Sequence, residues 1–139
     1  MLHQRFVAKF KKILLVDDHE SVLKVLEGLL AQPSVELLLA GCGEEALHVA
    51  RLEHPDLVLL DVCMPGMDGL EVCDAIKNDP ELSGTRVILM SAVLGEGSVR
   101  EGGEDVGADG YLAKPFNPDS VRAGVAALLA LKRGECSEH

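Results

Sequence analysis

The stretch Ile13-Leu-Leu-Val-Asp-Asp18 opens with four apolar residues and closes with two acids. A short apolar run that ends at polar residues is typical of a strand buried on both faces of a parallel sheet. Comparable runs, bounded by Gly, Pro, Asp or Ser, follow along the chain at residues 35–39, 57–60, 87–90 and 111–113. The sequence therefore predicts five buried parallel strands.

Segments with the period of a helix lie between these runs. Apolar residues at every third or fourth position form one stripe near the N-terminus and another near the C-terminus. Strict alternation of strands and helices predicts right-handed crossovers and a parallel sheet covered by helices on both faces, which is an α/β fold. The two stripes consist of Val22, Val25, Leu26, Leu29 and Leu30, and of Val121, Val125, Leu128 and Leu129.

Two helices carry local signals of their own. Asn117 followed by Pro118 predicts an N-cap with proline at the first helical position. The fourth helix must come from about residues 96–106, where Gly97, Gly102 and Gly103 each cost about 1 kcal/mol relative to alanine. We expect a short, mobile or partly unwound element there.

Length and charge narrow the class of protein. A chain of 139 residues fits one domain and leaves no room for a separate output domain, so we expect none. The formal net charge of -10 repels phosphate backbones and anionic membranes, which argues against nucleic-acid binding and membrane association. The apolar runs are far shorter than the ~20 residues that cross a bilayer, so we expect a soluble, cytoplasmic protein.

Functional side chains follow the predicted strands at the point where each one ends. The first run is followed by Asp17 and Asp18, the third by Asp61, the fourth by Ser91 and the fifth by Lys114. A single carboxylate in such a place is usually a helix cap, but ligands of open parallel sheets bind at this edge, and five polar groups converge on it. Three carboxylates close together repel one another unless a cation is present. Oxygen ligands of this kind suit Mg²⁺.

The combination of four segments resembles the response-regulator receiver family. The segments are Ile13-Leu-Leu-Val-Asp-Asp18, Asp61-Val-Cys-Met-Pro-Gly-Met-Asp-Gly69, Ser91-Ala92 and Gly107-Ala-Asp-Gly-Tyr-Leu-Ala-Lys-Pro-Phe116. The resemblance implies a flavodoxin-like (βα)5 three-layer sandwich whose five-stranded parallel sheet has the order 2-1-3-4-5. It covers a receiver domain at residues 12–132, which leaves an N-terminal arm at 1–11 and a C-terminal tail at 133–139.

The resemblance also implies roles for the residues at the strand ends. Asp61 would be the phosphoacceptor, with Asp18 a direct Mg²⁺ ligand, Asp17 a ligand through water and the backbone carbonyl of Cys63 a further ligand. Ser91 and Lys114 would bind the phosphoryl oxygens, small Ala92 would leave access to them, and the Lys114–Pro115 bond would be cis.

Ser91 and Tyr111 would form the switch that reports phosphorylation. The phosphoryl donor would be a sensor histidine kinase or a histidine phosphotransfer protein, and the downstream partner would be an unidentified protein. Such a chain would be a signalling switch rather than an enzyme, either standing alone or as a fragment of a larger regulator.

Two other classes of protein share part of this sequence pattern. Phosphatases of the haloacid-dehalogenase type also use an aspartate nucleophile and Mg²⁺, but their second acid corresponds to Cys63, which lacks the required proton chemistry at neutral pH. The segment Gly41-Cys-Gly-Glu-Glu-Ala46 matches a dinucleotide-binding motif. There, Glu44 and Glu45 would occupy the helix N-terminus and repel a pyrophosphate.

Because the four cysteines form no C-x-x-C pair, a zinc site is not expected.

Overall fold

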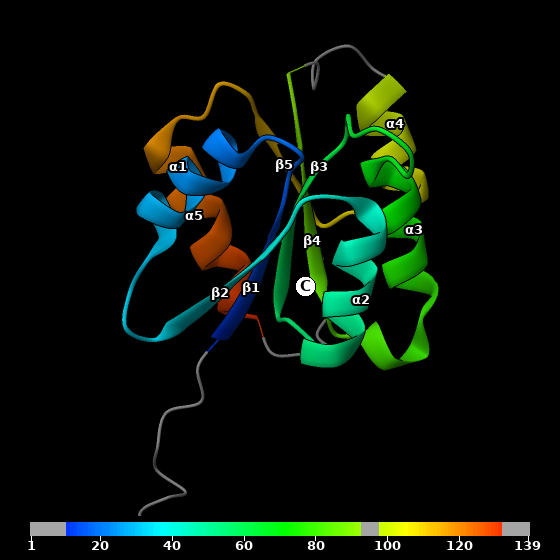
Figure 1. Ribbon diagram of the computed structural model, residues 1–139, viewed down its shortest axis with the longest axis horizontal. Helices are drawn as coiled ribbons and strands as arrows, with labels where there is room; N and C mark the ends of the chain where they lie inside the picture. The colour runs from blue at the N-terminus through cyan, green and yellow to red at the C-terminus, as the bar shows by residue number, and fades with distance from the viewer. Residues whose placement is uncertain (1–10, 93–97, 132–139) are drawn as a thin grey trace, which may run out of the picture.

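The computed structural model describes residues 11–92 and 98–131, and its central feature is a five-stranded parallel sheet (Figure 1). The strand order is β2-β1-β3-β4-β5, so the predicted order 2-1-3-4-5 is confirmed. The strands are β1 (Lys11–Val16), β2 (Val35–Ala40), β3 (Leu57–Asp61), β4 (Arg86–Ser91) and β5 (Gly110–Ala113). The helices are α1 (Glu20–Leu30), α2 (Gly43–Glu53), α3 (Gly69–Asn78), α4 (Ser98–Asp105) and α5 (Pro118–Leu129), with a 3-10 turn at Pro80–Leu82.

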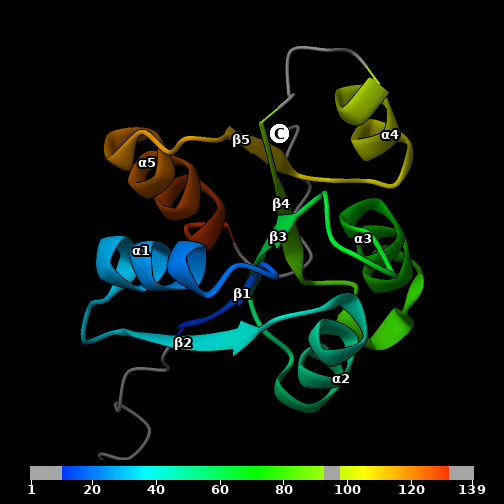
Figure 2. The ribbon, with the colours of Figure 1, turned by 45° about the horizontal axis from the view of Figure 1, so that its top comes forward.

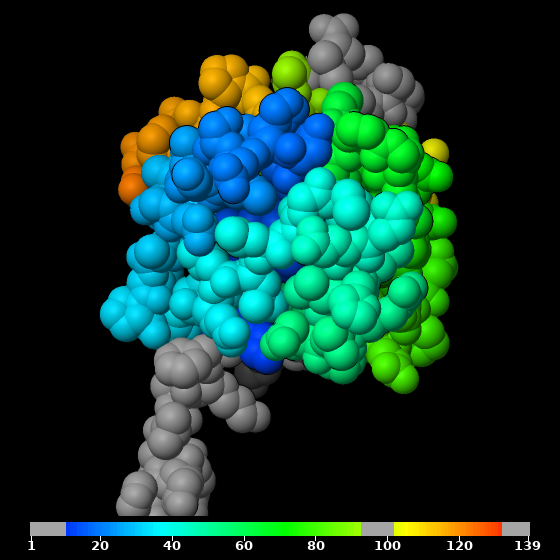
Figure 3. Space-filling model, viewed as in Figure 1, coloured from blue at the N-terminus to red at the C-terminus, as the bar shows by residue number. Residues whose placement is uncertain are grey.

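The helices form two layers, one on each face of the sheet. α1 and α5 lie on one side, and α2, α3 and α4 lie on the other, as both ribbon views show (Figures 1 and 2). β3 lies at the centre of the sheet and all five of its residues are buried. β2 is an outer strand, and in the space-filling view it lies on the near face together with α2 (Figure 3). The apolar runs of the sequence are thus the middle layer of a three-layer sandwich.

Side-chain alternation divides the core into two clusters, one on each side of the sheet. In β1, Leu14 and Val16 belong to the cluster under α2 and α3, whereas Ile13 and Leu15 belong to the cluster under α1 and α5. Successive residues of a strand point to opposite faces, so this alternation continues past the strand ends. It therefore decides which of the polar residues at the strand ends share a face.

The predicted apolar stripe of α1 is wrong at one position. Leu26 and Leu30 are buried as expected, but Val25 is 52% exposed and Leu23 takes a place in the core instead. The stripe is wide enough for two neighbouring choices of core face, and the packing of α1 against the sheet selects the one centred on Leu23, Leu26 and Leu30. Val25 is left at the surface beside the edge of the sheet.

The glycine-rich fourth helix is short, as expected, but it is a regular α-helix over the residues that the structure describes. A Cβ atom added to Gly103 would lie 2.6 Å from the Tyr111 hydroxyl and 2.8 Å from Cδ1 of Leu89. Glycine at position 103 therefore lets α4 approach β4 and β5 more closely than any other amino acid at that position would allow. Gly97 lies outside the described residues, so the expectation for it is not tested.

Local capping and a partly buried ion pair help to set the positions of α5 and β5. Asn117 accepts hydrogen bonds from the backbone of Asp119 and Ser120, which confirms the predicted N-cap of α5. Asp109 accepts hydrogen bonds from Nζ of Lys77 at 2.7 Å and from the backbone of Val87 at 2.8 Å. This contact ties the start of β5 to α3 and β4, and so fixes the position of β5 along the edge of the sheet.

No helix among the described residues is both long and apolar enough to cross a membrane.

Candidate functional site

Three of the predicted site residues lie on the same face at the carboxyl edge of the sheet. Asp17 follows β1, Asp61 is the last residue of β3 and Lys114 follows β5. In each strand, the residue two positions earlier (Leu15, Leu59 or Leu112) belongs to the core cluster under α1 and α5. The period of two in a strand therefore directs all three polar side chains toward that side.

The Lys114 ammonium lies between two buried carboxylates. Its Nζ donates to Oδ2 of Asp17 at 2.8 Å and to Oδ1 of Asp61 at 3.1 Å. The Asp17 side chain is fully buried and that of Asp61 is 4% exposed, whereas that of Lys114 is 21% exposed. These contacts join residues 97 and 53 positions apart in the chain. The backbone N–H of Lys114 also donates to the carbonyl of Ser91, which holds the base of the side chain at the end of β4.

Burial and charge act in opposite directions on these groups. Burial raises the pKa of Asp61 above its ordinary value, and the nearby Asp17 charge adds to this, while hydrogen bonds from Lys114 and from the backbone of Cys63 lower it without reversing the shift. For Lys114, burial alone lowers the pKa, but the hydrogen bonds and charges of Asp17 and Asp61 outweigh it, so its pKa is raised. Lys114 is thus a cation at neutral pH, and one positive charge faces more than one carboxylate.

Asp18 and His19 complete the polar cluster. The side chain of Asp18 is 25% exposed, and that of His19 is 65% exposed. One ligand atom from each of Asp17, Asp18, His19 and Asp61 lies within 4.8 Å of the others. Carboxylate oxygens with an open, solvent-facing side suit Mg²⁺, which keeps several waters and binds through few carboxylates. The donor set present therefore fits a divalent cation.

His19 was not predicted from the sequence as a member of this cluster. Its position directly after two acids was the available signal, but a histidine at a helix start is more often a surface residue. Cys63, by contrast, was predicted as a ligand through its backbone carbonyl. The structure places Cys63 at the surface, two residues beyond Asp61, and its backbone N–H donates to the Asp61 carboxylate.

Ser91 and Tyr111 lie on the opposite face of the sheet from the carboxylates. Ser91 follows Met90, which belongs to the cluster under α1 and α5, so alternation directs the buried Ser91 side chain toward the α3 and α4 side. Tyr111 packs against the core cluster on that same side and contacts α4 at Gly103. The two predicted switch residues therefore share a face and lie on neighbouring strands.

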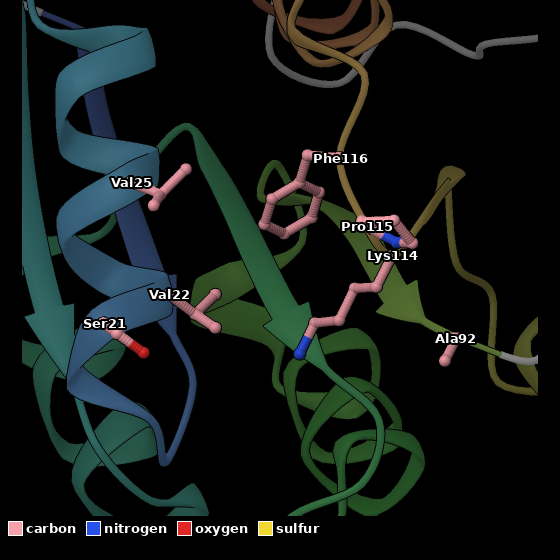
Figure 4. Close-up of a pocket in the computed structure, with 7 residues that line it drawn as sticks. All are labelled: Ser21, Val22, Val25, Ala92, Lys114, Pro115 and Phe116. Atoms are coloured by element: carbon pink, nitrogen blue, oxygen red, sulfur yellow. The ribbon is translucent and has the colours of Figure 1, made fainter.

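An apolar cavity of about 520 Å³ opens beside Lys114. In the close-up, Val22 and Val25 of α1 face Phe116 across it, and the Lys114 side chain runs along its edge toward the end of β3 (Figure 4). Ala92 lies at the rim and is exposed. The Lys114–Pro115 bond is cis, as predicted.

Comparison with known proteins assigns the chain to a family. The family model of the response regulator receiver domain matches residues 13–126. The transcriptional regulatory protein PhoP of Bacillus subtilis, named for alkaline phosphatase synthesis, is 41% identical over 119 residues, which cover 86% of this chain and 48% of PhoP. The chain spans about half the length of most of the curated relatives that it matches.

Solved structures agree with this assignment. The chemotaxis protein CheY4 of Vibrio cholerae superposes with a TM-score of 0.80 at 29% identity, covering 86% of this chain and 98% of that one. The receiver domain of the sensor histidine kinase PA1611 from Pseudomonas aeruginosa, described with a magnesium ion coordinated in its active site cleft, gives a TM-score of 0.79 at 25% identity over 88% of this chain and 99% of that one. The chain belongs to the response regulator receiver family and has the fold of a receiver domain of two-component signalling.

Proposed function

We propose that this receiver domain is phosphorylated on Asp61 in a Mg²⁺-dependent reaction. The observation that carries the proposal is the position of the Lys114 ammonium, hydrogen-bonded to both Asp17 and Asp61 at the edge where Asp18 also lies. The Lys114 ammonium and a cation held by the carboxylates beside it would be two cationic groups facing one incoming phosphoryl group. Asp61 is the buried carboxylate closest to the centre of the sheet.

In the proposed reaction, an Asp61 carboxylate oxygen forms a bond to the phosphorus of a phosphohistidine, and the P–N bond breaks. The electron pair of that bond stays with the donor imidazole, which leaves. Lys114 and Ser91 bind the phosphoryl oxygens. With a small acyl phosphate as donor, the bond that breaks is the P–O bond to the acyl group, and a carboxylate leaves.

Four groups would hold the metal: the Asp18 carboxylate directly, Asp17 through water, the other Asp61 oxygen and the backbone carbonyl of Cys63. When bound, Mg²⁺ supplies positive charge to the phosphoryl oxygens. The protein's own part is to hold the Asp17 and Asp61 carboxylates in place, which the contacts with Lys114 favour.

The proposed switch uses the opposite face of the sheet. The Ser91 hydroxyl moves toward the new phosphoryl group, and Tyr111 turns into the space that it leaves, so the equilibrium between two conformations shifts. The shared face of Ser91 and Tyr111 and the contact of Tyr111 with α4 support this route. The surface formed by α4 and β5 would then change most.

The proposed donors are a sensor histidine kinase or a histidine phosphotransfer protein, and the proposed recipient of the signal is another protein. The net charge of -10 argues against nucleic acid as a partner of this domain. We propose no enzymatic turnover of phosphomonoesters, because the position two residues after Asp61 holds the thiol of Cys63 instead of a second acid.

Intact-mass measurement tests the phosphoacceptor. The protein is incubated with a small acyl phosphate, with Mg²⁺ or with a chelator. We expect one added phosphoryl group with Mg²⁺, little or none with the chelator, and none in Asp61→Asn.

Asp119→Asn is the matched control, because the Asp119 side chain lies on α5 and is fully exposed. This variant should gain the same adduct as the unmodified protein. Persistence of the adduct in Asp61→Asn would show that another residue accepts the phosphoryl group.

A further inference from the structure

The imidazole of His19 is turned toward the acidic cluster. Its Nδ1 lies 3.2 Å from Oδ1 of Asp17 and 3.3 Å from Oδ1 of Asp18. The backbone N–H of His19 also donates to Oδ1 of Asp17 at 2.9 Å, which fixes the start of the residue against the site. A nitrogen donor is therefore placed among the oxygen donors of the proposed metal site.

The His19 side chain has no capping role that would account for this position. His19 is the N-cap residue of α1, but its side chain makes no hydrogen bond to the amides of the first turn. Its carbonyl, in contrast, accepts from the backbone of Val22 and Leu23. The backbone thus starts the helix, and the ring faces the carboxylates.

The distances suit a single metal ion. One ligand atom from each of Asp17, Asp18, His19 and Asp61 lies within 4.8 Å of the others. Metal–ligand bonds of roughly 2.1 Å place ligands on opposite sides of an ion about 4.2 Å apart, so the set needs to contract by about half an ångström. The exposed side chains of His19 and Asp18 are free to make that movement.

We propose that His19 is a direct nitrogen ligand of this site and makes it prefer first-row transition-metal dications over Mg²⁺. Mg²⁺ is a hard ion that takes oxygen ligands, whereas imidazole suits ions such as Ni²⁺ and Zn²⁺. With Mg²⁺ the carboxylates alone act as side-chain ligands, and with a transition metal His19 joins them. The inference rests on the proposed function, because it concerns the same metal site.

Metal binding in the absence of any phosphoryl donor tests the proposal. Calorimetry measures the affinity of the full chain for Ni²⁺ and for Mg²⁺ separately, in the unmodified protein, in His19→Ala and in His48→Ala. His48 is the matched control, since it is an exposed histidine on α2. We expect His19→Ala to lower Ni²⁺ affinity at least about tenfold, the lower end of the losses measured even for outer-shell partners, and to change Mg²⁺ affinity less than about twofold.

Pulsed EPR of bound Mn²⁺ detects the nitrogen directly. A ¹⁴N coupling should be present in the unmodified protein and in His48→Ala, and absent in His19→Ala. An unchanged ratio of Ni²⁺ to Mg²⁺ affinity in His19→Ala, or no ¹⁴N coupling in the unmodified protein, would overturn the inference.

The two proposals can fail separately. If Asp61 accepts a phosphoryl group while His19→Ala changes nothing, only this inference fails. If the ¹⁴N coupling is present but no adduct forms on Asp61, only the proposed function fails.

Discussion

Lys114 is the residue on which the charge balance of the site depends. Its ammonium occupies the space between Asp17 and Asp61, where it neutralises part of their repulsion. A divalent cation in the same cluster is repelled by that ammonium until a phosphoryl group adds negative charge between them. Lys114 therefore opposes metal binding in the resting state and supports the phosphorylated state.

Lys114→Ala should bind Mg²⁺ as tightly as the unmodified protein or severalfold more tightly, because a competing positive charge is gone. The same variant should form or use the phosphorylated state poorly. Mg²⁺ titration monitored by calorimetry measures the first effect, and intact mass after incubation with an acyl phosphate measures the second.

Lys24→Ala serves as the control, since Lys24 is an exposed lysine on α1. It should leave both measurements unchanged. Markedly weaker Mg²⁺ binding in Lys114→Ala would mean that the lysine organises the carboxylates for the metal instead of competing with it.

Among the elements, α4 depends on a glycine for its close packing against the sheet. Glycine in a helix costs about 1 kcal/mol relative to alanine, so the pair Gly102 and Gly103 weakens the helix as a local structure. The structure shows what is gained at Gly103, where the Tyr111 ring and Leu89 fill the space that a Cβ would need. The close approach of α4 to β5 is therefore a packing requirement.

Gly103→Ala should lower the free energy of unfolding by about 1–2 kcal/mol, because overpacking costs more than the helix propensity returns. Urea unfolding measures the loss. Tyr111 is the only tyrosine and the chain has no tryptophan, so the near-ultraviolet circular dichroism of the tyrosine reports the displaced ring.

Gly28→Ala in α1 is the control, because an added Cβ there meets nothing within 4 Å. It should raise the free energy of unfolding by up to about 1 kcal/mol and leave the tyrosine signal unchanged. Equal stabilisation by the two variants would show that α4 can move away from Tyr111 without loss.

At the scale of the whole molecule, stability at alkaline pH reports on the core under α2 and α3. Cys73 is fully buried there, and its thiol contacts the carbonyl of Val106. Burial raises the pKa of Cys73 from 9.0 to about 11. The protonated thiol is thus favoured in the folded state, and its contribution to stability is complete below pH 9 and is lost as the pH rises from 9 to about 11.

Compared with Cys73→Val, the unmodified protein should therefore lose about 2 kcal/mol of unfolding free energy over that interval. Urea unfolding of both proteins at several pH values between 8 and 11 measures the difference. Cys63→Ser, which changes an exposed thiol, should follow the unmodified protein at every pH. A difference between the unmodified protein and Cys73→Val that stays constant with pH would contradict the assignment of this loss to Cys73.

The positions of the strands and the residues that end them follow from the sequence. Buried parallel strands are continuous apolar runs, so the first polar residue after each run marks the carboxyl edge of the sheet. That rule alone predicts that Asp17, Asp61 and Lys114 lie together at one edge of the sheet. Family resemblance supplied the strand order and the expected roles, which periodicity alone does not contain.

The contacts that depend on how the layers pack are seen first in the three-dimensional structure. It turned the exposed imidazole of His19 toward two carboxylates, left Val25 at the surface and closed α4 onto Tyr111 through Gly103. The physical reason is the same in each case. A local pattern specifies which face of an element is apolar, but the rotation of a helix over the sheet, the rotamer of an exposed ring and the spacing of two layers depend on residues distant in the chain.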